Sequence, residues 1–310
     1  MKYLIFILAV IASSVNATPA SFLIAASSSS DTYQQMLAQI QTVCGNNEFV
    51  IEKIPGSGGA IENLEQLVNN KANAAFIHSD VIYAKSQTDG NYRKYKTLVN
   101  LYPEEIHIVA LRTAKETTGG VAGFGAKPVI YKSLSEMVGL NVGASGGSAI
   151  SASILAGTGG GHFTVVPYGS GKAVLAALDS GEIQAAIFVG GAPLQNIADL
   201  KGDSYKLIPI GDSIKGKVAG DSGVYKPAVI SYTNLRSDSI QTVSTSAIIV
   251  TRTYSTPEYV APQKWFRECF YEHLTKLQET PNTHKKWSEI DPTDQGVWQW
   301  YEFGVAPAKK

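Results

Sequence analysis

Short apolar runs alternate along this chain with longer segments in which apolar residues recur every three or four positions. Residues 49–54 (FVIEKI) and 74–78 (AAFIH) are typical of buried strands, whereas residues 33–44 have the spacing of an amphipathic helix that ends at Gly45. Strands separated by helices are joined by right-handed crossovers into largely parallel sheets. The sequence therefore predicts an α/β fold.

The same spacing rules place the remaining elements. We expect further strands at 21–26, 106–111, 140–143, 163–168, 183–189, 205–210 and 242–251. Helices are expected at 61–68, 149–155, 174–181, from 262 to 274, near Trp287 and at 294–301. Two Gly-containing segments without periodicity, 114–130 and 212–227, are expected to be surface loops.

The first twenty residues have the order of a secretory signal peptide. Lys2 precedes the apolar stretch 3–11 (YLIFILAVI), and small residues follow. The stretch is too short for a permanent membrane span, with an uncleaved anchor as the alternative. We assign residues 1–20 to the signal peptide, with cleavage after Ala17 or after Ala20 left open, and no Cys is near for lipid attachment. We therefore expect an exported protein.

Charge and cysteine content limit the possible partners. The chain has 26 Lys+Arg and 26 Asp+Glu, and loss of Lys2 with the signal leaves 25 against 26. No global charge therefore attracts nucleic acid or anionic lipid.

After export, Cys44 and Cys269 either pair or remain two buried thiols. Motifs for a metal or a nucleotide cofactor are absent from the sequence, so we expect neither.

Three strand-to-helix turns combine small, hydroxylated or glycine residues with a helix start. Helix starts present backbone N–H groups without internal partners, which hold carboxylates or phosphates. Ligands of open α/β sheets lie beyond the carboxyl ends of the strands, where these turns lie. Ordinary helix capping is the alternative for each turn. The turns supply as candidate ligand-binding residues Ser28, Ser30, Asp31, Thr32, Tyr33, Gly58, Gly59, Ala60, Ser145, Gly146, Gly147 and Ser148.

A catalytic alternative exists at the third turn. Residues 143–147 (GASGG) fit the G-x-S-x-G pattern of a nucleophile elbow, with Ser145 as nucleophile and His273 or His284 downstream. The pattern is permissive in a chain with 29 Gly, and His273 falls on the apolar stripe of a predicted helix. We therefore expect a binding protein and no enzyme.

Several motifs resemble those of one family of binding proteins. Residues 58–64 (GGAIENL), 75–81 (AFIHSDV) and 98–109 (LVNLYPEEIHIV) are similar to the TRAP-associated extracytoplasmic immunogenic (TAXI) proteins, as are 178–186 and 189–193 (VGGAP). The resemblance implies a type II periplasmic-binding-protein fold, with two Rossmann-like α/β lobes joined by a hinge. Lobe I would take residues 21–110 and 245–310, and lobe II residues 111–244.

The resemblance also implies a role and partners. A TAXI protein is a periplasmic, monomeric receptor that captures a small carboxylate or amino acid, such as glutamate, and delivers it to the membrane subunits of a TRAP transporter. A sensor input or surface antigen without transport is the alternative. The matching positions add to the candidate ligand-binding residues Asn63, His78, Ser79, Asp80, Gly190, Gly191 and Pro193.

Other residues bear on the ligand and on the cysteines. Arg112, beside the expected hinge, would be the cation for a ligand carboxylate, with a surface salt bridge as the alternative. The resemblance puts Cys44 and Cys269 in one lobe, which favours a disulfide. Asp31, Gln34 and His78 depart from the family's usual residues, so the identity of the ligand stays open.

Overall fold

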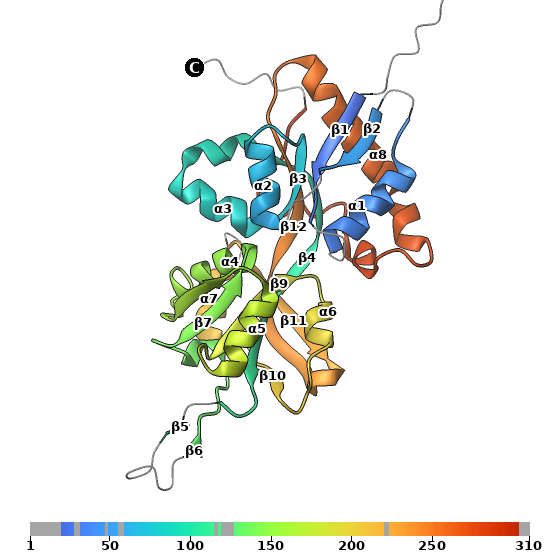
Figure 1. Cartoon of the computed structure of the whole chain (residues 1–310). Helices are drawn as coiled ribbons and strands as arrows, with labels where there is room; N and C mark the ends of the chain where they lie inside the picture. Colours follow the sequence, from blue (N-terminus) through green and yellow to red (C-terminus); the bar gives the residue numbers. More distant parts are fainter. Residues whose placement is uncertain are drawn as a thin grey trace, which may run out of the picture.

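The computed structural model describes residues 20–27, 32–46, 49–54, 59–114, 117–118, 127–219 and 223–303. Apart from Ala20, the predicted signal peptide lies outside these residues. Figure 1 shows two α/β lobes stacked end to end and joined by two long strands. Within the described part of the chain, no helix is both long enough and apolar enough to cross a membrane.

Lobe I is built from both ends of the chain. Its parallel strands lie in the order β2-β1-β3, and helices cover them. The N-terminal elements are β1 (Ala20–Ala25), α1 (Thr32–Val43), β2 (Phe49–Lys53), α2 (Ala60–Val68), β3 (Ala74–His78), α3 (Ser79–Thr88) and the 3-10 helix η1 (Gly90–Lys94). The C-terminal elements are α8 (Pro257–Glu279) and the 3-10 helix η4 (Lys285–Glu289).

Lobe II repeats the alternation. Its parallel strands β7 (Asn141–Ser145), β8 (Thr164–Tyr168) and β9 (Ala185–Gly190) lie in the order β9-β7-β8. The helices are α4 (Gly147–Ala156), α5 (Gly171–Ser180), α6 (Gln195–Ala198), α7 (Asp212–Val218), η2 (Leu134–Glu136) and η3 (Thr233–Leu235). Further strands are β5 (Thr117–Thr118), β6 (Lys127–Pro128), β10 (Tyr205–Leu207) and β11 (Lys226–Tyr232).

Two long antiparallel strands connect the lobes. β4 (Tyr95–Leu111) pairs with β12 from Tyr95 to Glu105 and with β9 from Glu105 to Val109. β12 (Ser237–Arg252) pairs with β11 in lobe II and with β3 in lobe I. The chain thus crosses between lobes twice, as in type II periplasmic binding proteins, and the predicted fold class is confirmed. The exact boundaries predicted for the lobes stay predictions.

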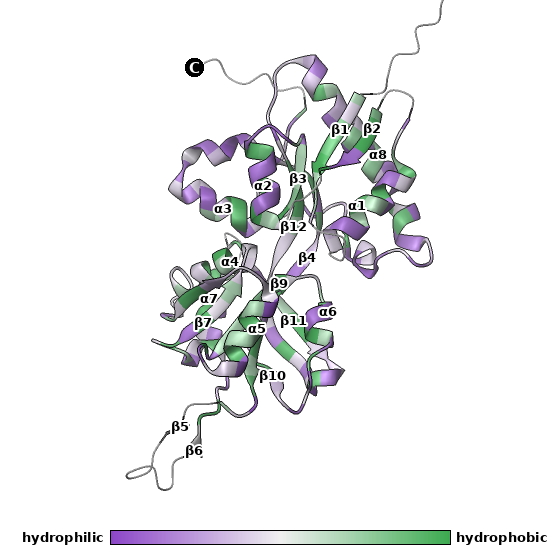
Figure 2. Ribbon diagram, in the orientation of Figure 1, coloured by the Kyte–Doolittle hydropathy of each residue, from purple (hydrophilic) through white to green (hydrophobic). Residues whose placement is uncertain are grey.

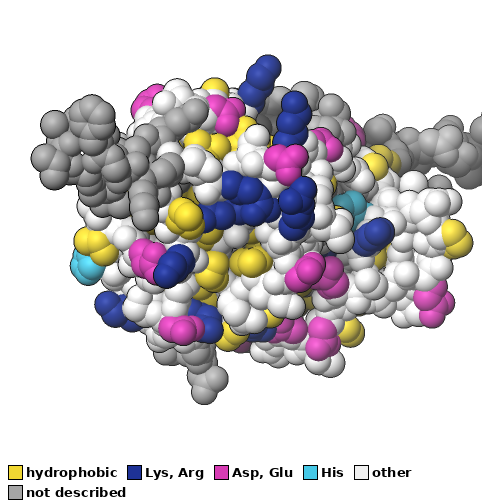
Figure 3. All heavy atoms as spheres, turned by 90° about the horizontal axis from the view of Figure 1, so that it is seen from below, with side chains coloured by type: hydrophobic (Ala, Val, Ile, Leu, Met, Phe, Trp, Pro, Cys, Tyr) yellow, Lys and Arg dark blue, Asp and Glu magenta, His cyan; other side chains and the backbone are white. Residues whose placement is uncertain are grey.

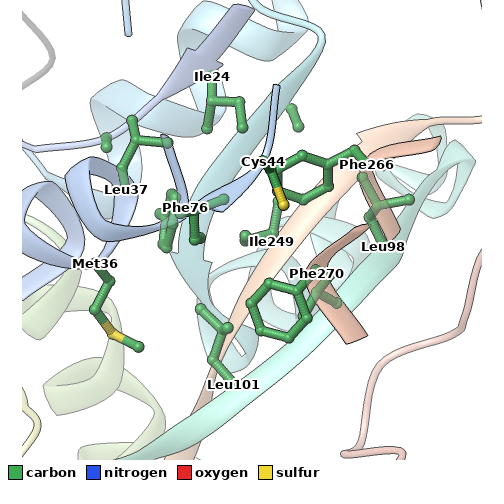
Figure 4. Close-up of a cluster of buried hydrophobic side chains, with 14 of the residues drawn as sticks. Ile24, Met36, Leu37, Cys44, Phe76, Leu98, Leu101, Ile249, Phe266 and Phe270 are labelled. Atoms are coloured by element: carbon green, nitrogen blue, oxygen red, sulfur yellow. The ribbon is translucent and has the colours of Figure 1, made fainter. Parts of the chain in front are cut away.

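Each lobe has its own hydrophobic core. Figure 2 shows apolar residues gathered in strands such as β1 and β7, while polar residues are frequent in α2 and α3. In lobe I, Phe76 of β3 and Ile249 of β12 pack with Phe266 and Phe270 of α8 (Figure 4). Cys44 and Cys269 form a disulfide at the edge of this core, which ties the end of α1 to α8. Helix α8 belongs to lobe I because its apolar face completes the core begun by the N-terminal strands.

The structure corrects two of the predicted elements. Residues 294–301 form no helix but an irregular segment, in which Gly296 has a φ of +62° and Trp300 forms an isolated bridge to Thr97 of β4. The apolar residues of this segment contact β4, so their near-helical spacing in the sequence does not correspond to a helix. The segment 212–227 is only partly a loop, since it contains α7 and the start of β11.

Candidate functional site

The predicted turns of both lobes meet where the lobes face each other. His78 ends β3 in lobe I, and Ser145 and Gly190 end β7 and β9 in lobe II. Helices α2 and α3 begin on the lobe I side, and α4 begins on the lobe II side. The described residues of this site are packed against each other, so the lobes are in contact.

Asp80, in the first turn of α3, lies at the centre of this contact. Its side chain is fully buried. Oδ2 accepts hydrogen bonds from Ser151 Oγ of α4 and from Tyr225 Oη, each at 2.6 Å. Oδ1 accepts from His78 Nδ1. The carboxylate of a lobe I residue is therefore held by two hydroxyl groups of lobe II.

The environment of Asp80 keeps it ionised. Burial alone would raise the pKa of Asp80, but the charge of His78 and the hydrogen bonds from His78, Ser151 and Tyr225 outweigh burial and lower it below the usual 3.8. The same carboxylate, together with burial, raises the pKa of Tyr225 well above 10, so this phenol stays a donor. At neutral pH the ionised carboxylate of Asp80 therefore accepts hydrogen bonds from the two neutral hydroxyls of Ser151 and Tyr225 and from the imidazole of His78.

Gly147, at the start of α4, permits the close approach of the lobes. A Cβ atom at this position would overlap the Nε2 and Cε1 atoms of His78 and would lie 3.2 Å from the Cβ of Ala60 in α2. His78 is held by Asp80 and is 5% exposed, so its ring has little freedom to move. Only glycine fits at this point of contact.

Replacing Gly147 with alanine is therefore expected to push α4 away from His78. Overpacking of this kind destabilises by about 1–3 kcal/mol, and opening of the lobes relieves it. We expect a larger radius of gyration by small-angle X-ray scattering and a lower urea midpoint. Gly169→Ala is the control, because a Cβ at Gly169 meets no atom within 4 Å. Identical scattering from the two variants would contradict the prediction.

A second contact between the lobes involves the hinge strand β4. Lys286 of η4 is 1% exposed, and its Nζ lies 3.0 Å from Glu105 Oε1 and 2.6 Å from Glu289 Oε2. Glu105 Oε2 accepts a hydrogen bond of 2.7 Å from the backbone N–H of Ala192 in lobe II. Burial raises the pKa of Glu105, an effect that Lys286 and this N–H oppose. A buried ion pair thus joins lobe I to the loop after β9.

Other predicted residues make contacts within the protein. Tyr33 Oη donates to Glu104 Oε2 of β4 at 2.6 Å, and Asn63 Nδ2 donates to the carbonyl of Phe76. The hydroxyls of Ser79 and Thr245 are 2.9 Å apart. The side chain of Ser148 accepts from the N–H of Val189, which fixes the start of α4 to β9.

The remaining predicted positions fall into three groups. Thr32 and Ala60 begin α1 and α2, Gly59 precedes α2, Ser145 ends β7, and Gly146 connects β7 to α4. Gly190, Gly191 and Pro193 follow β9, where a Cβ at Gly191 would lie 2.6 Å from Lys286 Cε. Ser28, Ser30, Asp31 and Gly58 lie outside the described residues.

The structure does not place Arg112 at the site. It follows the far end of β4 in lobe II, where Nε donates to the carbonyl of Gly202 and a terminal nitrogen donates to that of Leu235 at 2.6 Å. Figure 3 shows that end of lobe II, where Lys and Arg side chains gather on the surface. The predicted role of Arg112 as the ligand's cation is therefore wrong, since β4 extends well past the hinge before Arg112 is reached.

Residues that the sequence did not indicate complete the contact between the lobes. Ser151, Tyr225, Glu104, Glu105 and Lys286 were absent from the predicted set. Glu104 and Glu105 carry a detectable signal, since two adjacent acidic residues interrupt an apolar strand. The sequence gives no sign that Ser151 and Tyr225 belong to the site, because they lie 71 and 145 positions from Asp80 along the chain.

The histidines proposed for a catalytic triad have other partners. His273 Nδ1 lies 3.0 Å from the carbonyl oxygen of Cys269 within α8 of lobe I, whereas Ser145 lies at the end of β7 in lobe II. His284 Nδ1 accepts from the N–H of Lys286 and caps η4. The grouping of Cys44, Cys269 and His273 offers no metal site, because its two sulfur atoms are joined.

Three sizeable cavities are lined by described residues outside the predicted binding set. One of about 800 Å³ is lined by Lys96, by 253–255 and by 295–302 on lobe I. One of about 420 Å³ is lined by Tyr271, 292–293, Gln295 and Trp300. The third, of about 350 Å³, is lined by β4, β12, β11 and residues 289–297, and it includes Glu105 and Thr245, which take part in the contacts described above.

Solved structures that share this fold include substrate-binding proteins of transporters. The chain resembles the substrate-binding protein of an amino acid ABC transporter with a TM-score of 0.51 and 8% identity, over 87% of this chain and all 100% of that one. It also resembles AbpA, an amino acid ABC transporter substrate-binding protein from Streptococcus pneumoniae bound to L-arginine, with a TM-score of 0.50 and 10% identity over 87% and 95% of the chains. Tv2483 bound to L-arginine is similar with a TM-score of 0.50 and 12% identity, over 86% of this chain and 90% of that one.

Sequence comparison gives the family directly. No curated protein sequence matches this chain. The model of the NMT1-like family matches residues 24–296, which include both lobes and both crossing strands. The chain belongs to the NMT1-like family.

Proposed function

We propose that this protein is an extracytoplasmic solute-binding receptor that captures a small ligand between its two lobes and delivers it to a membrane transporter. The supporting observation is the contact between lobes at the carboxyl ends of β3, β7 and β9, where helix starts from both lobes converge. Helix starts hold anionic groups without a full positive charge. The NMT1-like family match and the fold shared with substrate-binding proteins of transporters are consistent with this role.

We further propose that the transporter is of the TRAP type and that the protein belongs to the TAXI branch. The motifs at 58–64 and 75–81 support this assignment. The predicted signal peptide supports a periplasmic location, and a monomer is sufficient because both halves of the site come from one chain. The protein would be no enzyme and would need no cofactor.

The ligand is proposed to be a small carboxylate, with glutamate or another amino acid as the first candidates. Lys286 and His78, the basic side chains described above at the contact between the lobes, are each engaged with a carboxylate. A ligand carboxylate would therefore be held by backbone N–H groups and hydroxyls at the starts of α2 and α4. An ammonium group on the same ligand would suit the acidic surroundings of Glu104 and Asp80.

A thermal-shift screen against amino acids and dicarboxylates tests this proposal. A ligand present at about 100 times its dissociation constant stabilises the folded state by about 2.7 kcal/mol. For a protein of this size we expect the melting temperature to rise by roughly 5 °C or more. An amino acid with its carboxylate amidated should give no shift. If no carboxylate raises the melting temperature, the ligand class is wrong.

A further inference from the structure

We propose that Asp80 is a latch residue that holds the two lobes closed through Ser151 and Tyr225. The inference rests on the proposed function, because lobe closure matters for a protein that captures a solute between its lobes. It assigns to Asp80 a role different from the direct ligand contact predicted from sequence.

The hydrogen bonds of Asp80 are divided between the two lobes. Its Oδ1 faces His78, two residues earlier in lobe I, while Oδ2 takes both hydroxyl donors of lobe II at 2.6 Å. Its backbone N–H lies 3.3 Å from Thr245 Oγ1 of the crossing strand β12. The carboxylate thus has one fixed partner in its own lobe and two partners that can be present only while the lobes touch.

This arrangement stabilises the closed state selectively. A fully buried carboxylate needs charge-assisted hydrogen bonds, because an unpaired buried charge is strongly unfavourable. When the lobes separate, water can solvate Oδ2 in place of the two hydroxyls. Removing a lobe II donor therefore leaves the free energy of the open state unchanged and raises that of the closed state. Hydrogen bonds to charged groups are strong enough that each loss should shift the equilibrium towards the open form by roughly tenfold or more.

The position of the latch also suits a closure contact. Tyr225 precedes β11 and bridges to Ala219 after α7, so its phenol reaches Asp80 from the body of lobe II. Ser151 lies one turn inside α4, whose first residue, Gly147, packs against His78. The Glu105–Lys286 pair contacts lobe II separately, through the loop after β9. The lobes are also joined by an ion pair of 2.8 Å between Lys226 Nζ of β11 and Asp294 Oδ2 of lobe I, so the Asp80 contact is one of several and is the one that ties α3 to α4.

The test uses ligand-free protein and the variants Ser151→Ala, Tyr225→Phe and the double substitution. Each keeps the shape of the side chain and removes only a hydroxyl donor. We expect amide hydrogen exchange in α3 and α4 to accelerate roughly tenfold in each single variant, and more in the double one. Exchange in α1 and α8 should stay unchanged, and small-angle scattering should show a larger radius of gyration.

The matched control is Tyr205→Phe. Its hydroxyl also donates to an aspartate at 2.6 Å, but the partner, Asp179, lies in the same lobe. The control should leave the exchange of α3 and α4 and the radius of gyration unchanged. If the double variant behaves like this control, the latch is refuted. Accelerated exchange spread equally over α1 and α8 would also refute it, because general destabilisation would then be the cause.

The outcome separates the latch from the proposed function. The exchange experiment contains no ligand, so a latch can be found even if no carboxylate shifts the melting temperature, in which case the proposed ligand class fails alone. Conversely, a ligand-induced shift together with unchanged exchange in the double variant would refute only the latch.

Discussion

Replacing both Cys44 and Cys269 with alanine is expected to lower the free energy of unfolding by about 5 kcal/mol. The bridge closes a segment of 225 residues, and the loop-entropy relation gives this value for a loop of that length. It joins the end of α1 to α8, so it links the N-terminal and C-terminal parts of lobe I. The change should appear as a lower urea midpoint under non-reducing conditions.

The wild-type protein in reductant provides the control for this prediction. If the effect comes from the covalent link, the reduced wild type and the double alanine variant should unfold at nearly the same urea concentration. Titration of the unreduced, unfolded wild type with a thiol reagent should find no reactive thiol. A double variant within about 1 kcal/mol of the oxidised wild type would show that the two chain segments are held by packing alone.

The alternation of strands and helices was sufficient to predict an α/β fold, whereas the two lobes and the hinge were predicted from the resemblance to TAXI proteins. The strand β3 has the predicted bounds, because its five apolar or buried residues lie between a polar turn and a helix start. The strand β4 is much longer than predicted, since Glu104 and Glu105 interrupt its apolar pattern. Both carboxylates are buried, Glu104 against Tyr33 of lobe I and Glu105 against Lys286 and the loop after β9. The two residues that hide the strand in the sequence therefore have partners only in the folded protein.

The site was harder to predict than the fold. The turns around Gly59 and Gly147 were identified because a strand, a glycine and a helix start follow one another locally. The latch was not, because Asp80 meets Ser151 and Tyr225 only after the two lobes close on each other. Arg112 was misplaced for a similar reason: its distance from the hinge depends on the length of β4, which the sequence pattern does not reveal.

Replacing Lys286 with methionine is expected to destabilise the protein by about 3 kcal/mol or more at neutral pH. The ammonium group is buried over the ring of Tyr102 and bonds to Glu105 and Glu289. Methionine keeps most of the apolar side chain but leaves Glu105 buried without its cation, a situation that typically costs about 3–5 kcal/mol. Glu289 can turn towards water, because 39% of its side chain is exposed.

The loss should also depend on pH in a definite direction. Burial already raises the pKa of Glu105, and removal of Lys286 raises it further. A carboxyl whose folded pKa lies above its unfolded value binds more protons when folded, so stability falls as pH rises through that interval. The variant should therefore recover part of its stability as the pH is lowered from 8 towards 5, relative to the wild type. Urea unfolding across this range measures the effect.

Two further variants show whether the buried pair is the cause. Lys264→Met removes an exposed lysine 3.7 Å from Glu268 and should change stability little at any pH. Adding Glu105→Gln to Lys286→Met should restore stability and remove the added pH dependence, because no buried charge remains at this contact. If Lys286→Met were no more destabilising than Lys264→Met, the Glu105–Lys286 pair would contribute nothing to the fold. The contact between β4 and the loop after β9 would then depend on the Ala192 hydrogen bond and packing alone.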